Sequence, residues 1–555
     1  MMGESSADEV GGAAAPLRDV RSMRHGFSLW SAALLSLTSM RPLVGIAAAA
    51  YLISSGGLGS WLAVLLLLLV LLVVASVFGE LASRWPLEGS VYAWSRQLVG
   101  PRVGFLAGWA HLWSYVLFMA ALSFFDTQRI FFLLGLPPPG HLEASLANAV
   151  LIAAATALNA ARRVYFKVFA LTAAAVSVLG VMVYATILLV SHRQRSFASL
   201  FESPLGSALD WAWFSGPFLV VLAFASSFAL RGFEMPAEVA EEVRDPRRNV
   251  PRVMIWTLLA GGAITLYGVI ALSMAVPDVT SVGIAVDKSL YAGSLASTVR
   301  VALGDEAALL LTVLFIVATF CSATVFQLAA SRTLWTMARE RELPGHAFLV
   351  ELTANERLPR NALLVVGAVG AALPFLIQER TAFLLQLASC APMLLAFLVP
   401  VLGLIALRRR GGWQPGPWSL GYWGTPAAVV AALSLAALCL NALWPRSGGA
   451  LNGTGWLSWL PEIVLLGILC SGALLLRWAA GRRAGAAGES EPPDAHTHER
   501  IRLRYSGRCI FCSEALAAGQ EVYWDRGAYV TLCAACHSPA NLATLALASR
   551  VRGVA

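Results

Sequence analysis

Charged side chains are scarce in this sequence of 555 residues. Asp, Glu, Lys and Arg together make up 13% of the chain, whereas apolar residues make up 58%. A typical soluble domain holds about 25% charged residues, so this composition excludes an ordinary water-soluble fold. The mean hydropathy of +0.70 agrees and indicates a protein embedded in a lipid bilayer.

Two sequence signatures are missing. No G-x-x-x-x-G-K-[ST] motif occurs, which argues against a pump driven by ATP. The first apolar run is too long for the apolar region of a signal peptide, and no small-residue cleavage site follows it, so we expect no cleavable signal.

Apolar stretches of about 20 residues can each cross a bilayer as a helix. We count twelve and predict an all-α polytopic membrane protein with about 12 transmembrane helices. The stretches cover residues 27–53, 61–78, 104–125, 145–158, 168–190, 213–230, 253–276, 307–328, 362–377, 383–407, 426–443 and 456–476. The fourth is short, and the last contains Pro461 and Glu462.

Basic residues are concentrated in alternate loops. If the N-terminus lies inside, the inner segments hold most of the arginines, including the clusters at 162–167, 244–252 and 408–410. The outer loops hold only Arg129, Arg193, Arg195, Lys288, Arg300, Arg380 and Arg446. This asymmetry is typical of cytoplasmic loops and predicts that both termini are cytoplasmic. It also accounts for the net charge of +8 without a nucleic-acid partner.

Two of the apolar stretches carry an arginine beside a helix breaker. Arg41 precedes Pro42 in the first, and Arg231 precedes Gly232 in the sixth. A charge at the centre of a bilayer costs on the order of 3 kcal/mol by insertion scales, so it usually faces a protein interior or a wet cavity. Interruptions at corresponding positions of two halves indicate the substrate site of a transporter. The sequence leaves open that both arginines extend to a membrane interface.

The positions of these breaks also indicate a repeat. The first and sixth stretches are five apart, and an odd repeat unit inserts its second copy upside down, as in many secondary transporters. We therefore predict a 5+5 inverted repeat followed by two extra helices. Pro42 lacks an N–H group, while Gly45 and Gly232 tolerate unusual dihedral angles. The N-termini of broken helices suit a carboxylate ligand.

Several segments at the inner ends resemble motifs of the amino acid–polyamine–organocation superfamily. The run ELASRWPLEGSVY at 80–92 resembles the segment after the family's second span. GFE at 232–234 with EEVRDPRRNVP at 241–251 resembles the motif after its sixth span. SR at 331–332 and PRNA at 359–362 are similar to the end of its eighth and the start of its ninth. The resemblance covers nearly all of the chain up to residue 478.

This resemblance implies a fold like that of the leucine transporter and a secondary active transporter, not an enzyme. The expected cargo is an amino acid or a related amine or organocation, held between spans one, three, six and eight. Phe228 matches the family's gating aromatic, and Glu234 matches an acidic position after the break. Pro42 and Val44 stand near the place of a small Gly-rich triplet, so Arg41 is expected to supply the anion contact instead.

Two residues of the third span are candidates for coupled protons. His111 and Asp126 lie toward opposite ends of that span. The sequence alone favours the alternative that both are hydrated residues at the membrane interfaces.

The chain divides into four parts by composition. We predict an N-terminal cytoplasmic tail at 1–25, a permease domain at 26–478, a flexible linker at 479–499 and a small folded module at 500–555. The linker is rich in Gly, Ala, Ser, Glu, Pro and His and has no apolar period.

The last part contains two C-x2-C pairs, Cys509 with Cys512 and Cys533 with Cys536. This spacing predicts a structural zinc site with four thiolate ligands beside a β-hairpin. Such a small module has too little core to fold alone, so the metal would supply stability. The run from Cys533 to His537 also matches the attachment motif of c-type haem, which would require a location outside the cytoplasm.

The function that follows is transport of a small molecule across the bilayer. One alternative is a membrane sensor that binds its ligand and signals through the zinc module. A second is an electron carrier with haem at Cys533–His537. The tail is also the expected attachment point for a protein partner.

Overall fold

The computed structural model describes residues 28–161, 163–203, 209–276, 304–353, 358–376, 386–446, 455–487 and most of 498–541. The predicted N-terminal tail, 1–25, lies outside these residues, as do 488–497 of the predicted linker. The chain forms two compact units, a helical unit over Met23–Ala479 and a second unit that holds the chain from Ala480 onward.

The first half of the helical unit begins with a broken span and ends after a second one. Its helices are α1 (Leu29–Met40), α2 (Pro42–Gly56), α3 (Trp61–Arg84), α4 (Ser90–Val99), α5 (Pro101–Leu133), α6 (His141–Ala160), α7 (Arg163–Ser191), α8 (Trp211–Ser215), α9 (Pro217–Phe228) and α10 (Met235–Glu238). The second half contains α11 (Pro246–Ala275), α14 (Asp305–Arg339), α15 (His346–Leu349), α16 (Arg360–Ala372), α18 (Cys390–Arg409), α19 (Gly424–Leu443) and α20 (Leu460–Ala487).

Nine of the described helices are long and apolar enough to cross a membrane, and α1 with α2 forms a tenth, bent span. Two shorter apolar helices cover Pro217–Phe228 and Arg360–Leu376. Each of the twelve predicted stretches falls on one of these helices, which confirms the predicted all-α architecture. The structure adds α4, a helix between the second and third spans.

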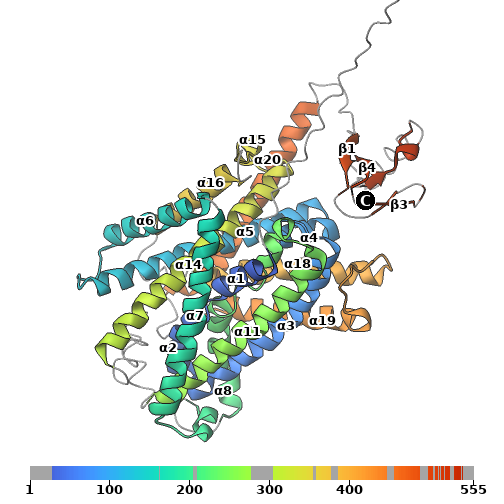
Figure 1. Cartoon of the computed structure of the whole chain (residues 1–555). Helices are drawn as coiled ribbons and strands as arrows, with labels where there is room; N and C mark the ends of the chain where they lie inside the picture. The colour runs from blue at the N-terminus through green and yellow to red at the C-terminus, as the bar shows by residue number, and fades with distance from the viewer. Residues whose placement is uncertain are drawn as a thin grey trace, which may run out of the picture. The chain divides into compact units, whose positions relative to one another are not determined.

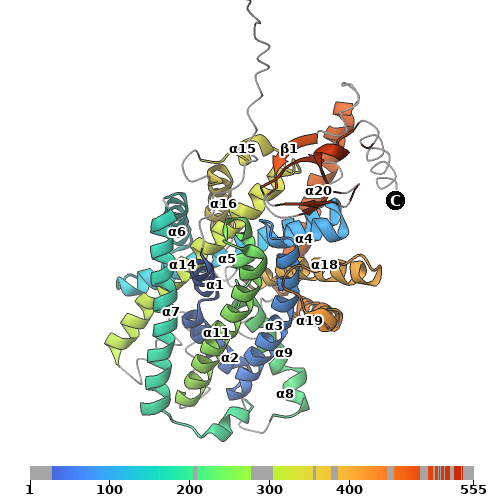
Figure 2. The same cartoon turned by 45° about the vertical axis from the view of Figure 1, so that its right-hand side comes forward.

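Long helices of the unit pack in pairs (Figures 1 and 2). α5 lies along α14, α3 along α11, and α18 along α19. α1 contacts α7, α10, α11 and α14 and is therefore enclosed by other helices. Its buried residues include Leu35 and Met40, which join a core of apolar side chains that runs through the whole unit.

The first span is interrupted at one residue. Arg41 adopts a left-handed backbone conformation, with φ of 41° and ψ of 67°, and separates α1 from α2. Pro42 then occupies the first turn of α2, where its missing N–H costs no hydrogen bond. The predicted break is therefore present, and it arises at Arg41 and Pro42 themselves.

The sixth span is interrupted over a longer segment. α9 ends at Phe228, Ala229 is extended, and Leu230 has a φ of 59°. Gly232 has a φ of 97°, and a Cβ atom there would lie 2.2 Å from Ser39 Oγ. Only glycine fits this close approach between the two breaks. Ser39 Oγ and Ser36 Oγ of α1 also lie 3.0 Å and 3.3 Å from the Gly232 carbonyl oxygen.

Among its described residues, the second unit contains two small antiparallel sheets. Their strands are β1 (His498–Arg502), β2 (Gly507–Arg508), β3 (Ala515–Leu516), β4 (Glu521–Asp525) and β5 (Val530–Leu532), and β2 pairs with β3. The order β1-β4-β5 forms one sheet, with Ile501 opposite Val522 and Tyr523 opposite Leu532. The β-hairpin predicted beside the cysteines is present as the antiparallel pair of β4 and β5. The buried core consists of Cys509, Leu516, Val522 and Cys533.

One boundary differs from the predicted linker. α20 continues to Ala487, beyond the predicted end of the permease domain at 478. The residues concerned are mainly alanine and arginine, which have high intrinsic helix propensity. An apolar period is not needed for such a segment to continue an existing helix.

Candidate functional site

Arg41 lies inside the protein at the first break, with 1% of its surface exposed. Its guanidinium group donates to the Ser39 carbonyl oxygen at 3.0 Å and to Ser322 Oγ of α14 at 3.1 Å. A third hydrogen bond, of 2.9 Å, reaches the carbonyl oxygen of Phe228 at the second break. Arg41 therefore joins the two breaks and does not extend to a membrane interface.

Arg231 lies inside the protein at the second break and is 2% exposed. Its Nη1 donates to Ser389 Oγ at 2.6 Å, and its Nη2 lies 3.4 Å from the Ser114 carbonyl oxygen of α5. Within the described residues, its Nε has no hydrogen-bond partner. Both of these hydrogen-bond partners are neutral, and the nearby negative charge is the buried carboxylate of Glu234.

Both guanidinium groups contact one aromatic ring. The Cζ atoms of Arg41 and Arg231 lie 4.6 Å and 4.0 Å from the centroid of Phe118 on α5. The arrangement allows cation–π attraction. The structure thus brings the two arginines that the sequence singled out to one aromatic ring.

Phe228 is the last residue of α9 and is 2% exposed. Its ring lies 5.1 Å from the Arg41 Cζ atom and stacks on Phe224 at a centroid distance of 5.8 Å. This predicted gating aromatic therefore borders the arginine pair.

The backbone N–H groups at the N-terminus of α2 are either absent or already hydrogen-bonded. Pro42 has no N–H, and the N–H of Leu43 donates to Ser177 Oγ at 3.1 Å. The N–H groups of Val44 and Gly45 donate to the Arg41 carbonyl oxygen. An anion at this break would therefore meet the side chain of Arg41 rather than free backbone donors.

Val44 and Gly45 lie in packing positions. Val44 is fully buried in the apolar core. A Cβ atom on Gly45 would lie 2.6 Å from Thr265 Cγ2 of α11, so this glycine permits close packing of α2 against α11.

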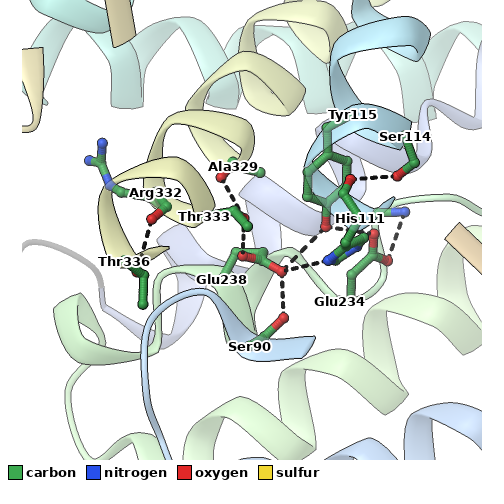
Figure 3. A network of polar contacts seen from close by, with 11 residues as sticks. Ser90, His111, Ser114, Tyr115, Glu234, Glu238, Ala329, Arg332, Thr333 and Thr336 are labelled. Carbon is green, nitrogen blue, oxygen red and sulfur yellow. Dashed lines mark hydrogen bonds and ion pairs between the residues drawn. The ribbon is translucent and has the colours of Figure 1, made fainter. Parts of the chain in front are cut away.

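Glu234 is fully buried just after the second break. One carboxylate oxygen accepts the Gly232 N–H at 3.1 Å, and the other lies 3.2 Å from the Tyr115 hydroxyl. Figure 3 shows that this carboxylate belongs to a larger polar network that includes His111 and Glu238.

Sequence reasoning missed several residues around the arginines. They are Ser114, Tyr115 and Phe118 on α5, Ser322 and Phe326 on α14, and Ser389 before α18. The first three share a helix face with His111 at spacings of three, four and seven residues, which is the one signal available from sequence.

The four tail cysteines converge as their spacing predicted. One sulfur atom from each of Cys509, Cys512, Cys533 and Cys536 lies within 4.8 Å of the others. The Cys512 and Cys533 sulfurs are 3.6 Å apart, close to the separation of about 3.8 Å expected for tetrahedral thiolates on zinc. His537 instead stacks on Tyr523, with ring centroids 3.7 Å apart. The donor set therefore fits a metal ion.

The decisive comparison concerns the helical unit. Residues 27–469 match the family model described as amino acid permease. The chain belongs to the amino acid permease family. This confirms the resemblance that the inner motifs indicated, and it makes the protein a multi-pass membrane transporter.

Relatives of the permease carry transporter names. An uncharacterized transporter of Mycobacterium tuberculosis is 29% identical over 362 residues, which is 63% of this chain and 74% of the relative. The branched-chain amino acid permease BcaP of Lactococcus lactis is 28% identical over 366 residues, 61% of this chain and 72% of the relative. The low-affinity putrescine importer PlaP of Escherichia coli is 24% identical over 309 residues, 54% of this chain and 64% of the relative.

The contact between Phe228 and Arg41 leads to a prediction. Phe228→Ala should weaken substrate binding by removing one wall of the arginine pair, while Phe228→Trp should preserve it. The measurement is the apparent affinity for uptake of labelled amino acids, with expression and thermal stability recorded alongside. Wild-type affinity in a well-expressed Ala variant would contradict the role. A loss of expression alone would instead indicate packing.

Proposed function

We propose that this permease is a secondary active transporter that moves amino acids by alternating access, with the substrate carboxylate held by Arg41 and Arg231. The observation that carries this proposal is the convergence of two buried guanidinium groups on Phe118 at the two helix breaks. A planar guanidinium pairs with a carboxylate through two parallel hydrogen bonds. The occupied amides of α2 support the same assignment, because they leave the anion contact to side chains.

The amino group of such a substrate would face the acidic and carbonyl groups of the second break. Glu234 and the Phe228 carbonyl oxygen both lie there. Of the two named relatives, BcaP has an amino acid as its stated substrate, whereas putrescine, the stated substrate of PlaP, has no carboxylate. Two arginines favour an amino acid, because its carboxylate can pair with a guanidinium group. Glu234 can balance one arginine, so an amine or organocation remains the second candidate.

Alternating access is supported by closures on both sides of the arginines. On α5, Asp126 accepts from Arg129 Nη1 at 3.0 Å and from Thr319 of α14. Toward the other end of the helices, Arg332 of α14 binds Glu242 at 3.1 Å, and Arg339 lies 3.5 Å from Glu241. Movement of a ligand to either side would require the contacts between helices on that side to open, which are Asp126–Thr319 on the first side and the ion pairs of Arg332 and Arg339 on the second.

The second closure includes a buried acid outside the spans. Glu88, between α3 and α4, is fully buried, and its N–H donates to Glu241 Oε1 at 3.3 Å. Burial, together with the carboxylates of Glu242 and Glu241, raises the pKa of Glu88 well above its usual range. In the orientation that the loop charges predict, which places both termini in the cytoplasm, this closure is the inner gate.

We also propose that Cys509, Cys512, Cys533 and Cys536 hold one structural zinc ion. Four thiolates leave no open coordination position, so the metal would stabilise the small sheet rather than perform chemistry. The separation of the chain into two units supports an independent module joined to the permease domain, with a protein partner as its expected contact.

The test of transport is counterflow in proteoliposomes. Vesicles loaded with a mixture of unlabelled L-amino acids should accumulate external ¹⁴C-labelled L-amino acids through the purified protein, while vesicles without protein should not. Binding without counterflow would contradict the transport proposal and favour the sensor alternative, because a sensor binds its ligand without moving it.

A further inference from the structure

A buried polar cluster lies beside the arginine pair, where α5, α10 and α14 meet the start of α4 (Figure 3). Glu238 of α10 is at its centre. Its Oε1 accepts a hydrogen bond from Ser90 Oγ and lies 3.4 Å from the Tyr115 hydroxyl and 3.6 Å from His111 Nδ1. Its Oε2 accepts from Thr333 Oγ1 at 3.2 Å. All five residues are fully buried.

A second carboxylate shares the same tyrosine. The Tyr115 hydroxyl lies 3.2 Å from Glu234 Oε1 and 3.4 Å from Glu238 Oε1. A hydroxyl carries one proton and can donate it to only one of these two acids at a time. Two ionised carboxylates this close to one another in a dry interior repel, and one is expected to take up a proton.

The charges that face the cluster do not cancel. Within the described residues, Arg231 supplies the positive charge that acts on Glu234, and the cluster also holds Glu238 as a second buried carboxylate. Arg332 on α14 adjoins Thr333, but its guanidinium binds Glu242. Ser90 of α4 and Thr333 of α14 contribute neutral hydroxyls. With a neutral His111, the cluster holds one negative charge in excess, and a single proton would make it neutral.

His111 is placed to receive or share that proton. Among the described residues, neither ring nitrogen of His111 has a hydrogen-bond partner, although the side chain is fully buried. Such an unsatisfied polar group is costly in a protein interior. One added proton converts the 3.6 Å approach of Nδ1 to Glu238 into a charge-assisted N–H···O bond or an O–H···N bond.

From this geometry we propose that the His111–Glu238 pair is a proton-binding site that couples substrate movement to a proton gradient. The proposal rests on the transport function proposed above and names its driving ion. The imidazole of His111, which has no hydrogen-bond partner among the described residues, favours a proton over a sodium ion, because hard cations take oxygen ligands and not imidazole nitrogen. The other candidate in α5, Asp126, is already neutralised by Arg129.

The His111–Glu238 pair lies between the arginines and helix α4. On one side, the Ser114 carbonyl oxygen faces Arg231 Nη2 at 3.4 Å, and the Ser114 hydroxyl donates to the His111 carbonyl oxygen at 2.7 Å. On the other side, Glu238 holds Ser90 of α4. A proton on Glu238 weakens it as an acceptor for Ser90 and removes one negative charge from the cluster. Proton binding and release would thus bias both the substrate site and the α4 contact.

The test separates coupling from transport itself. Purified protein is reconstituted into vesicles that contain the pH dye pyranine, and a mixture of L-amino acids is added outside. Wild-type vesicles should acidify as amino acids enter. Glu238→Gln should abolish the acidification and lose accumulation driven by an inward proton gradient, yet retain counterflow of ¹⁴C-labelled L-amino acids. His111→Gln is the second variant, in case Glu238→Gln does not fold.

Glu462→Gln on α20 is the matched control, because it removes a membrane-embedded carboxyl outside the cluster. It should behave as the wild type. Unchanged acidification in Glu238→Gln and His111→Gln would overturn the assignment, as would wild-type uptake driven by a sodium gradient without acidification. If wild-type protein shows no counterflow, the transport proposal fails and this inference fails with it.

Discussion

Arg41→Met and Arg231→Met should each abolish uptake of labelled amino acids while leaving membrane insertion intact. Truncating one partner of a buried, hydrogen-bonded charge pair costs about 2 to 5 kcal/mol, equivalent to a loss of affinity of about 30-fold or more. Methionine keeps much of the side-chain volume and removes the charge. The measurement is initial uptake into proteoliposomes at several amino acid concentrations.

Arg195→Met is the matched control for these variants, because Arg195 is a partly exposed arginine that bonds the Val276 carbonyl oxygen away from both breaks. It should transport like the wild type. Normal uptake by both Arg41→Met and Arg231→Met, with unchanged apparent affinity, would remove the arginine pair from the substrate site.

Purified protein should contain one zinc ion per chain, bound by the tail cysteines. Cys509→Ser and Cys533→Ser should lose the metal and unfold the small sheet, because its buried core has only four residues. Cys470→Ser on α20 is the control, since this exposed cysteine lies outside the cluster. Metal analysis of the purified full chain, for the wild type and the three variants, gives the zinc content, and circular dichroism of the segment 499–555 with each tail substitution reports the sheet.

Truncation tests whether the permease domain transports without the zinc module. A chain ending near Arg483 should keep transport, because the tail belongs to a separate compact unit, and should lose regulation or partner binding instead. A folded tail fragment without metal would contradict the zinc assignment. A haem absorption band would replace it with the electron-carrier alternative.

The sequence was informative where structure depends on a single residue or a short spacing. Pro42 disfavours a helical conformation at Arg41 and suits the first turn of α2, and Gly232 marks a close approach that no other residue allows. The cysteine pairs converge, as the two C-x2-C spacings predicted. These features could be located without knowing how the helices pack.

Features that depend on packing could not be located in this way. Phe118 and Ser389 join the site because α5 and the start of α18 lie beside the breaks, and nothing in their local sequence shows this. The sequence singles out Gly45 because glycine tolerates unusual dihedral angles, but its missing side chain equally suits its close contact with Thr265. The pairing of His111 with Glu238 joins residues on different helices, so helical periodicity could suggest His111 but not its partner.

The most direct test of the central claim compares amino acids with their decarboxylated amines in the counterflow assay. Matched pairs are L-leucine with isoamylamine and L-ornithine with putrescine, each supplied unlabelled inside vesicles against external ¹⁴C-labelled L-amino acids. If Arg41 and Arg231 hold a carboxylate, at least one amino acid should drive accumulation and its amine should not. An amine that drives counterflow as well as its parent amino acid, in wild type and in Arg41→Met alike, would contradict the account.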